Sequence, residues 1–282
     1  MSDDGKPGNW GRWGNDDERG AVNLCTPARV LEAAQASRTG KVYGLALQLG
    51  RKTPPVFGRP EPQRLTVNSP ADFADHERFG APKGTGASDD MLILASHVGT
   101  HMDALAHVYA EDSIYNGYAA GTFTPRKGAT RCSIVKTASF AGRGVLLDVA
   151  GHQGVPLCEP GRPITADDLE ACRSAQEVEM RPGDILLVRT GWTEAHLRGE
   201  VAGDFQQPGL GLSAVDFVRD HDVSVVGADN SAVEVIPFDG NYLAVHVALL
   251  QRLGVSLMEH LWLAELAADR CHEFLLAVGA LP

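Results

Sequence analysis

The sequence has 282 residues and a formal net charge of -11, with 44% hydrophobic and 22% charged residues. These proportions are those of a globular protein, and an acidic surface repels phosphate backbones, which argues against nucleic acid as a partner. No stretch approaches the roughly 18 continuous apolar residues that a transmembrane helix needs. The N-terminus shows no basic segment followed by an apolar run, so we expect no signal peptide, no membrane partner and a cytoplasmic location.

The five cysteines are widely spaced, and none of them forms a CxxC pair. This distribution is typical of reduced, buried thiols in an intracellular protein. It provides neither a disulfide framework nor a thiolate metal site. Any metal centre must therefore be built from histidine and carboxylate side chains.

The N-terminal region predicts an irregular arm followed by a helix. Residues 1–20 are polar and glycine-rich, and we expect their two tryptophans, Trp10 and Trp13, to pack on the body or on a partner. Pro27 then opens a helix that continues to about Ala36, because Thr26 is a good N-cap and proline suits the first helical position.

The next segments predict strands and one long loop. Residues 42–49 alternate apolar side chains and predict a strand. Residues 51–90 are rich in proline, glycine and aspartate without clear periodicity, which is typical of a functional loop or lid. Short apolar runs bounded by Gly, Pro or Asp predict further, buried strands; they cover residues 91–95, 144–149, 184–190 and 223–227.

Helical patterns lie between and after these strands. Thr165 is the first residue of the segment TADDLEACRSA, and Asp168 follows it three residues later. This Ser/Thr-x-x-acid spacing indicates a helix that Thr165 caps at its N-terminus. Ser213 is expected to cap a second helix. Residues 246–253 and 259–268 predict two final helices around a break at Gly254. Alternating strands and helices indicate an α/β protein with a single domain.

The segment SHVGTHMDALAH concentrates the candidate chemistry, because it places His97, His101, Asp103 and His107 within eleven residues. Imidazole nitrogen and carboxylate oxygen suit Zn²⁺ or Mn²⁺, and the absence of thiolate argues against a closed structural zinc site. The alternatives are a helix with surface histidines or core histidines paired with Asp103.

The expected local geometry is a strand that exits into a turn. Gly99 permits a tight backbone, so His97 and His101 can converge and Asp103 can complete the face. Ser96 and Thr100 are candidates for hydrogen bonds that fix the imidazole tautomers.

Two later residues are further candidates. His246 lies in an apolar stretch, where it is more typical of a core histidine, whereas Glu259 in a hydrophobic run is an unusual burial for a carboxylate and therefore a candidate ligand or base. The remaining histidines have no such company and are assigned to the surface or to helix ends: His76, His152, His196, His221, His260 and His272.

The motif HVGTHMDALAH resembles the HxGTHxDxxxH signature of metal-dependent cyclase-family hydrolases, which include kynurenine formamidases and isatin hydrolases. The resemblance extends over most of the chain and is carried by GAVNLCTP (20–27), YNGYAAG (115–121), RGVLLDVA (143–150), RPGDILLVRTGW (181–192), VVGADNSAVEV (225–235) and GVSLMEHLWLAEL (254–266). The spacings and the Trp-Gly arm look more like the larger isatin hydrolase-type and dienelactone hydrolase-type members. Leu105, where the short formamidases often have proline, points the same way.

The resemblance implies roles for the motif residues. It places His97, His101 and Asp103 as metal ligands and His107 in proton transfer or substrate positioning. In two-metal members a later histidine and glutamate complete the site, and His246 and Glu259 match those positions. We therefore expect one, and at most two, Zn²⁺ or Mn²⁺ ions per chain, with His107, Glu259 and His246 as the catalytic set.

The resemblance also implies the architecture: a mixed β-sheet flanked by helices (swivelling β/β/α-like), with a 1–20 N-terminal arm, a 21–282 hydrolase domain and a homodimeric or homotetrameric assembly. Relatives usually continue past the point where this sequence reads AVGALP, so we expect one pocket wall to differ.

The expected function is hydrolysis of a small molecule by metal-activated water, at a cyclic amide, imide, lactam or lactone, or at an aryl formamide. Two alternatives stay open at this point: a metal-dependent lyase or dehydratase, and a non-catalytic metal-binding relative. Candidate pocket-lid residues are the 51–90 loop and the aromatic side chains of Trp10, Trp13, Phe73 and Tyr115.

Overall fold

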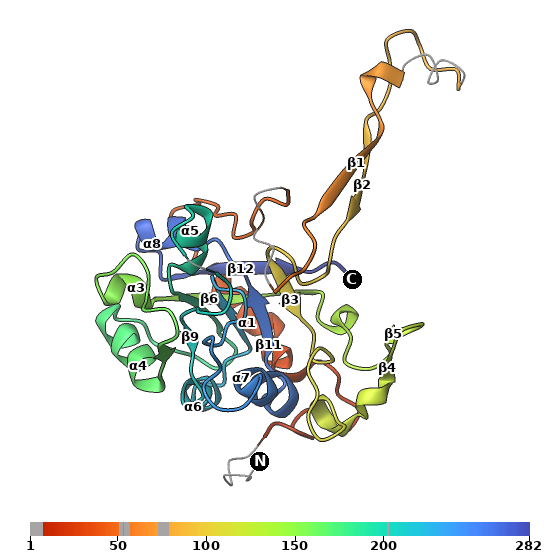
Figure 1. Ribbon diagram of the computed structural model, residues 1–282. Helices are drawn as coiled ribbons and strands as arrows, with labels where there is room; N and C mark the ends of the chain where they lie inside the picture. Colours follow the sequence, from red (N-terminus) through yellow and green to blue (C-terminus); the bar gives the residue numbers. More distant parts are fainter. Residues whose placement is uncertain (1–7, 51–52, 54–56, 73–78, 202) are drawn as a thin grey trace.

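The computed structural model describes residues 8–50, 53, 57–72, 79–201 and 203–282. Its centre is a mixed six-stranded sheet in the order β12-β6-β8-β10-β11-β3 (Figure 1). The four inner strands are parallel, and each edge strand is antiparallel to its neighbour. These strands are β3 (His101–Asp103), β6 (Ser139–Asp148), β8 (Ile185–Arg189), β10 (Val225–Ala228), β11 (Ser256–Glu259) and β12 (Glu273–Gly279).

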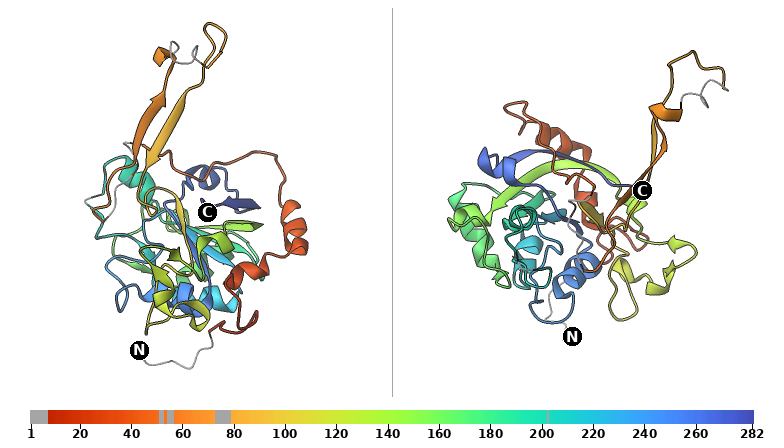
Figure 2. Two further views of the ribbon diagram at one scale, coloured as in Figure 1. Left: turned by 90° about the vertical axis from the view of Figure 1, so that its right-hand side faces the viewer. Right: turned by 45° about the horizontal axis from the view of Figure 1, so that its top comes forward.

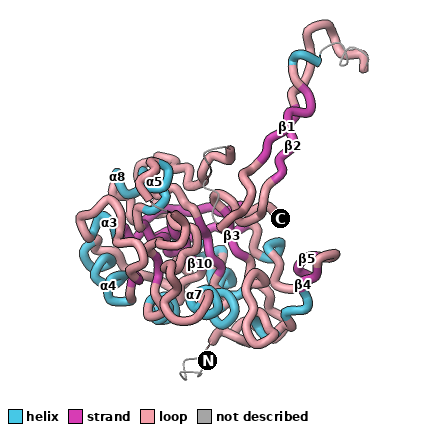
Figure 3. The backbone as a smooth tube through the Cα atoms, in the orientation of Figure 1, coloured by secondary structure: helices cyan, strands magenta, loops and turns pink. Residues whose placement is uncertain are grey.

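Alternating side chains of the inner strands build an apolar cluster on each face of the sheet, because successive residues of a strand point to opposite sides. Leu186 of β8 joins one cluster together with Leu169 and Phe217, and Leu187 joins the other together with Leu266. Figure 3 shows the helices arranged around these strands. They are α1 (Pro27–Ala34), α3 (Val149–His152), α4 (Ala166–Ala175), α5 (Trp192–Leu197), α6 (Ala214–Asp220), α7 (Ala244–His246), which continues as the π-helical η6 (Val247–Leu253), and α8 (Ala264–Ala268).

Short elements complete the described chain. The 3-10 turns are η1 (Gly20–Leu24), η2 (Pro70–Asp72), η3 (Tyr115–Gly117), η4 (Ala120–Thr122) and η5 (Ile134–Lys136). Two-residue strand pairs are formed by β4 (Phe123–Thr124) with β5 (Gly128–Ala129) and by β7 (Pro163–Ile164) with β9 (Gly209–Leu210). Within the described ranges, no helix combines the length and the apolar character needed to cross a bilayer.

The α/β class with a mixed sheet flanked by helices is confirmed, and so are several local predictions. Thr26 caps α1 by accepting a hydrogen bond from the backbone N–H of Arg29. Thr165 and Asp168 form the reciprocal capping box at α4. The buried strands expected near residues 144, 184 and 223 are β6, β8 and β10. Local signals were sufficient here because the flanking turns and caps are themselves local.

Other predictions were wrong. Residues 42–49 form no strand, although Tyr43 and Leu45 pack against the sheet from the side. The segment expected as a helix from residue 259 begins instead at the end of β11, and only 264–268 is helical. Ser213 precedes α6, but its hydroxyl accepts from the backbone N–H of Ala166 and so ties α6 to α4 instead of capping α6.

The N-terminal segment packs on the body of the protein. The indole N–H of Trp10 donates to the Gln251 carbonyl at 2.7 Å, and Trp13 packs against the buried cluster of the helical layer. Tyr115 is completely buried, and its hydroxyl donates to Asp17 at 3.1 Å. Tyr115 is therefore a core residue, and its assignment to a pocket lid was wrong. Phe73 and His76 lie outside the described residues.

The region expected as a loop or lid contains a β-hairpin. β1 (Gln63–Asn68) and β2 (Asp89–Ile93) pair antiparallel, and their ladder projects away from the body in every view (Figures 1 and 2). We call these two strands the hairpin arm. Met91 and its neighbours in β2 do form a strand, as predicted, but they are exposed and not buried.

Candidate metal centre

The pairing of the edge strand β3 with its neighbour β11 brings one basic and two acidic side chains onto one face of the sheet. His101 of β3 lies directly opposite Glu259 of β11 in the antiparallel ladder. Opposite residues in such a pair place their side chains on the same face, and Asp103, two residues after His101, shares that face. The distance from His101 Nε2 to Glu259 Oε2 is 3.1 Å.

The turn before β3 adds His97. Residues 96–100 form a tight turn in which Gly99 has a φ of +64°. A Cβ at Gly99 would lie 3.0 Å from Leu49 Cδ2 and from Thr53 Cγ2, so a larger residue would be crowded as well as strained in conformation. His97 Nδ1 then lies 2.8 Å from Asp103 Oδ1.

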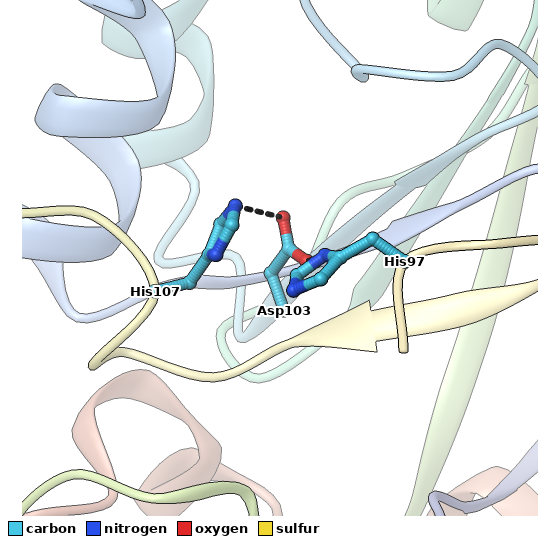
Figure 4. A group of neighbouring side chains, drawn as sticks. All are labelled: His97, Asp103 and His107. Atoms are coloured by element: carbon cyan, nitrogen blue, oxygen red, sulfur yellow. Dashed lines mark ion pairs between the residues drawn. The ribbon is translucent and has the colours of Figure 1, made fainter. Parts of the chain in front are cut away.

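His107 completes the outer side of the cluster. Its Nε2 lies 3.9 Å from Asp103 Oδ2, and Figure 4 shows His97 and His107 approaching Asp103 from different sides. The two imidazole rings stack with their centroids 4.1 Å apart. Their side chains are 26% and 31% exposed, whereas Asp103 is 1% exposed. His97 and His107 therefore form the solvent-facing side of the cluster, and Asp103 lies at its centre.

His246 enters from the helical layer. Its Nε2 lies 3.5 Å from Glu259 Oε1 and 3.7 Å from Asp103 Oδ2. Its other ring nitrogen, Nδ1, is hydrogen-bonded to Glu234, which is fully buried. Glu234 also accepts from the backbone N–H groups of Val245 and His246. Glu234 therefore orients the imidazole so that Nε2 faces the carboxylates.

The sequence analysis did not single out Glu234. The signal that was present is a carboxylate between apolar residues in SAVEV, the same unusual burial that identified Glu259.

The pKa values of the ionisable groups in the cluster are set by their burial and by the charged groups beside them. Burial opposes the charged form of His246, but the hydrogen bonds with Glu234 and Glu259 outweigh it and raise the pKa to about 10. Burial likewise opposes the charged form of Glu259, yet the hydrogen bonds from His101 and His246 hold its pKa below the usual range. The pKa of His107 is lowered, mainly by burial. Burial thus favours the neutral form of the His107 imidazole.

The donor atoms fit a divalent cation. His101 Nε2 and both carboxylate oxygens of Asp103 are buried, and in the described part of the chain none of them makes a well-directed hydrogen bond; their close neighbours are other imidazole and carboxylate groups of the same cluster. Leaving such atoms unpaired in the interior is costly, and coordination to a cation removes that cost. Among the residues that the structure describes, two groups have donor atoms close enough to hold an ion: His97–Asp103–His107 and His101–Asp103–Glu259. Asp103 belongs to both.

Strained backbone surrounds the cluster. Val233, Leu243 and His260 adopt left-handed conformations, with φ values of 56°, 56° and 54°. Each costs of order 1–3 kcal/mol in a non-glycine residue and is characteristic of functional sites. The three flank Glu234, the helix that carries His246, and Glu259. The backbone strain therefore lies beside the residues whose side chains enter the cluster or orient its histidine.

The structure brings all the predicted site residues together in one cluster: His97, His101, Asp103, His107, His246 and Glu259. The role predicted for Thr100 was wrong, since its hydroxyl accepts from the Leu47 N–H and donates to the His260 carbonyl. The Gly99 carbonyl, 2.8 Å from Nδ1, orients His101 instead.

His260 was also assigned wrongly. It is completely buried, with its ring centroid 6.2 Å from that of His101, and is neither on the surface nor at a helix end. Burial lowers its pKa to about 3, so it is neutral. Sequence reasoning missed it because the expected helix after residue 259 would have left it at a helix end.

Comparison with known proteins identifies the family. The cyclase family model matches residues 43–235. The chain belongs to the cyclase family. A crystal structure described as a novel cyclase is 34% identical and superposes with a TM-score of 0.87, covering 96% of this chain and 91% of that chain. A search of curated proteins finds no significant match.

More distant solved structures share the fold. An isatin hydrolase bound to the product analogue thioisatinate is 17% identical, with a TM-score of 0.60 and coverage of 90% of this chain and 99% of that chain. Isatin hydrolase A from Labrenzia aggregata, bound to benzyl benzoate, is 17% identical, with a TM-score of 0.54 and coverage of 84% and 86%.

Proposed function

We propose that this cyclase-family chain is a metal-dependent hydrolase that opens a cyclic amide, imide, lactam or lactone, or cleaves an aryl formamide, in a small-molecule substrate. The observation that carries the proposal is the buried group of imidazole and carboxylate atoms that converge around Asp103. Their mixed nitrogen and oxygen character suits Zn²⁺ or Mn²⁺. The isatin hydrolases among the structural relatives support the reaction class.

His97, His101 and Asp103 would hold the cation, with Glu259 and His246 on the inner side of Asp103 available for a second one. A bound divalent cation supplies hydroxide near neutral pH by lowering the pKa of a water from 15.7 to about 7. Glu259 and Asp103 balance its charge in the buried part of the site. Glu234 keeps His246 in the tautomer whose Nε2 faces the site.

His107 is the proposed proton-transfer residue. Its imidazole is neutral because burial lowers its pKa, and it lies on the solvent-facing side of the cluster. A neutral imidazole at that position can accept a proton from the attacking water and deliver it to the leaving nitrogen or oxygen. Asp103, 3.9 Å from His107 Nε2, stabilises the imidazolium while it carries the proton.

The test combines elemental analysis with turnover. Protein purified without chelator is expected to contain one or two equivalents of Zn or Mn and to open one member of a panel comprising isatin, a γ-lactam, a dienelactone and N-formylkynurenine. The His101→Ala variant should lose both metal and turnover. Reaction in ¹⁸O-labelled water should place one label in the new carboxylate.

Other outcomes would redirect the assignment. Turnover without incorporation of solvent oxygen would favour a lyase or dehydratase. Bound metal with no activity on any panel member or on related ring compounds would favour a non-catalytic metal-binding relative. Protein that holds no stoichiometric metal, and takes up none on reconstitution, would overturn the proposal.

A further inference from the structure

A second group of nitrogen-bearing side chains lies beside the metal centre and supplies none of its predicted ligands. Its inner part is three aromatic rings. The centroid of the His260 ring lies 6.2 Å from that of His101 and 5.9 Å from that of Trp192, and the Trp192 and His196 centroids are 4.7 Å apart. The three rings therefore form a row that begins beside a predicted metal ligand. Together with Arg59 we call them the nitrogen row.

Backbone hydrogen bonds fix the positions of these rings. Trp192 and His196 are four residues apart in α5, so their side chains are neighbours on one face of the helix. The turn before α5 is held by the Asp229 carboxylate, which accepts two backbone N–H groups. The backbone N–H of His260 donates to the Asn230 carbonyl at 2.9 Å. The rings thus stand on backbone that is itself held in place.

Arg59 forms the outer end of the row. Its guanidinium lies over the Phe57 ring, 5.6 Å from the ring centroid. The Phe57 N–H donates to Asp204 at 3.1 Å, and Asp204 is close enough to act electrostatically on His196. Arg59 acts in the same way on His260: burial is the main cause that lowers the pKa of this imidazole, and the guanidinium lowers it further. Arg59 therefore belongs with the three rings.

The row contains buried nitrogens that nothing in the described part of the chain satisfies. They are both ring nitrogens of His260, Trp192 Nε1, His196 Nδ1 and Arg59 Nη1. The side chains of His260 and Trp192 are completely buried. Buried polar atoms in proteins are normally paired, so a group of orphaned nitrogens in one place needs an explanation. A bound ligand group that accepts their hydrogen bonds provides one.

The hydrogen-bonding character of the row selects the ligand. An indole nitrogen and a guanidinium only donate, and an imidazole carries an N–H on at least one nitrogen. Arg59 also brings a full positive charge. A carboxylate only accepts, through two oxygens that offer about four lone-pair sites, and its hydrogen bonds with charged donors are the strong ones. An amide or a hydroxyl fits less well, because each adds a donor of its own to a site already rich in donors.

We propose that the nitrogen row binds a carboxylate of the substrate, next to the bond that the metal centre opens. This inference rests on the proposed function for the reaction and adds the substrate class, a ring compound that carries a carboxylate of its own. His260 and Trp192 donate to the carboxylate oxygens, and Arg59 balances the charge. Because His260 directly follows Glu259 in the chain, the end of β11 fixes the carboxylate relative to the metal centre.

The test measures binding of benzoate and of its uncharged isostere benzamide by isothermal titration calorimetry, with protein as purified and after chelator treatment. Benzoate should bind at least tenfold more tightly than benzamide in both preparations, because a charged acceptor makes stronger hydrogen bonds and none of the four residues is a predicted ligand. Benzoate should also raise the KM for the panel member that is turned over and leave kcat unchanged.

Two variants locate the binding site. Arg59→Gln and Trp192→Phe each remove a donor, and each should reduce the preference for benzoate over benzamide about tenfold. Arg64→Gln is the matched control, since it removes the same charge from a 70% exposed arginine of the hairpin arm that is paired with Asp90 at 3.8 Å. It should keep the wild-type preference. Far-UV circular dichroism checks that each variant is folded, and Arg59→Gln carries the test if Trp192→Phe does not fold.

Equal affinities for benzoate and benzamide in the wild type would overturn the inference. So would benzoate binding that disappears with the metal, inhibition that lowers kcat without raising KM, or a preference that Arg59→Gln retains or that Arg64→Gln reduces equally. Metal content of the same samples tests the proposed function separately. Absence of metal with an intact benzoate preference would refute the metal-dependent reaction and leave the carboxylate site, whereas stoichiometric metal without that preference would refute only the carboxylate site.

Discussion

Glu234 provides a sharp test of how the cluster is organised, because it contacts His246 and not the other predicted ligands. In Glu234→Gln the amide oxygen can still accept from the ring and the backbone, but the acceptor loses its charge. A hydrogen bond to a charged group contributes about 1.5–3 kcal/mol, against about 0.5–1.5 kcal/mol for a neutral one. The difference, about 1–1.5 kcal/mol, predicts roughly tenfold weaker metal binding.

Glu234→Ala removes the acceptor altogether. Residues that orient a metal-binding histidine typically contribute 10–100-fold to affinity, and we expect this variant at the upper end of that range. The buried N–H groups of Val245 and His246 also lose their partner, at a cost of about 1–3 kcal/mol in unfolding free energy for each. Metal affinity is measured by competition with a chromogenic chelator, and stability by denaturant unfolding of the metal-free protein.

Asp229→Asn is the matched control. Asp229 is also a buried carboxylate that accepts two backbone N–H groups, those of Thr190 and Gly191, but it contacts none of the predicted ligands. The Asp229→Asn substitution should lower the free energy of unfolding and leave metal affinity unchanged. Wild-type metal affinity in Glu234→Ala, or an equal loss of affinity in Asp229→Asn, would refute the orienting role of Glu234.

Three further predictions concern the cluster and the thiols. His107→Ala should keep its metal and lose turnover by 10²–10⁴-fold; near-full turnover with metal bound would contradict the proton-transfer role. Because the pKa of His246 is raised from 6.5 to about 10, its charge stabilises the metal-free protein fully below pH 6.5 and progressively less up to pH 10. The melting temperature of chelator-treated protein should therefore fall over that range, while metal affinity rises as protons leave; a flat profile of both would contradict this. Burial raises the pKa of the thiols of Cys132, Cys158 and Cys172 to about 12. Alkylation of the native protein should therefore spare these three cysteines and modify Cys25 and Cys271 first. Mass analysis of the alkylated peptides measures the order of modification.

The part of the site that could be predicted from sequence is the part that is close in sequence. His97, His101, Asp103 and His107 occupy one turn, one strand and the loop after it, so their spacing alone limits how far apart they can lie. Even so, a strand and not a helical turn brings these side chains together. His101 and Asp103 share a face because they are two apart in a strand.

Glu259 and His246 illustrate what sequence reasoning could identify but not place. Each was conspicuous as a polar residue in an apolar run, and both were assigned to helices; His246 does lie in α7, whereas Glu259 is the last residue of β11. Glu259 reaches the cluster because β11 pairs with β3, about 150 residues earlier, and this pairing is not encoded in either segment alone. A four-residue strand that is buried on both faces has no periodicity that separates it from a short buried helix.

The hairpin arm was predicted only in part: the run at residues 91–95 predicted the strand β2, but its exposure and its partner β1 were not expected. Strand signals rest on burial, either as alternation against one core or as a continuous apolar run. In the arm, Leu65 and Met91 share a face whereas Leu92 points the other way, and all three side chains are about half exposed. Apolar side chains were therefore present without the pattern that a single core imposes.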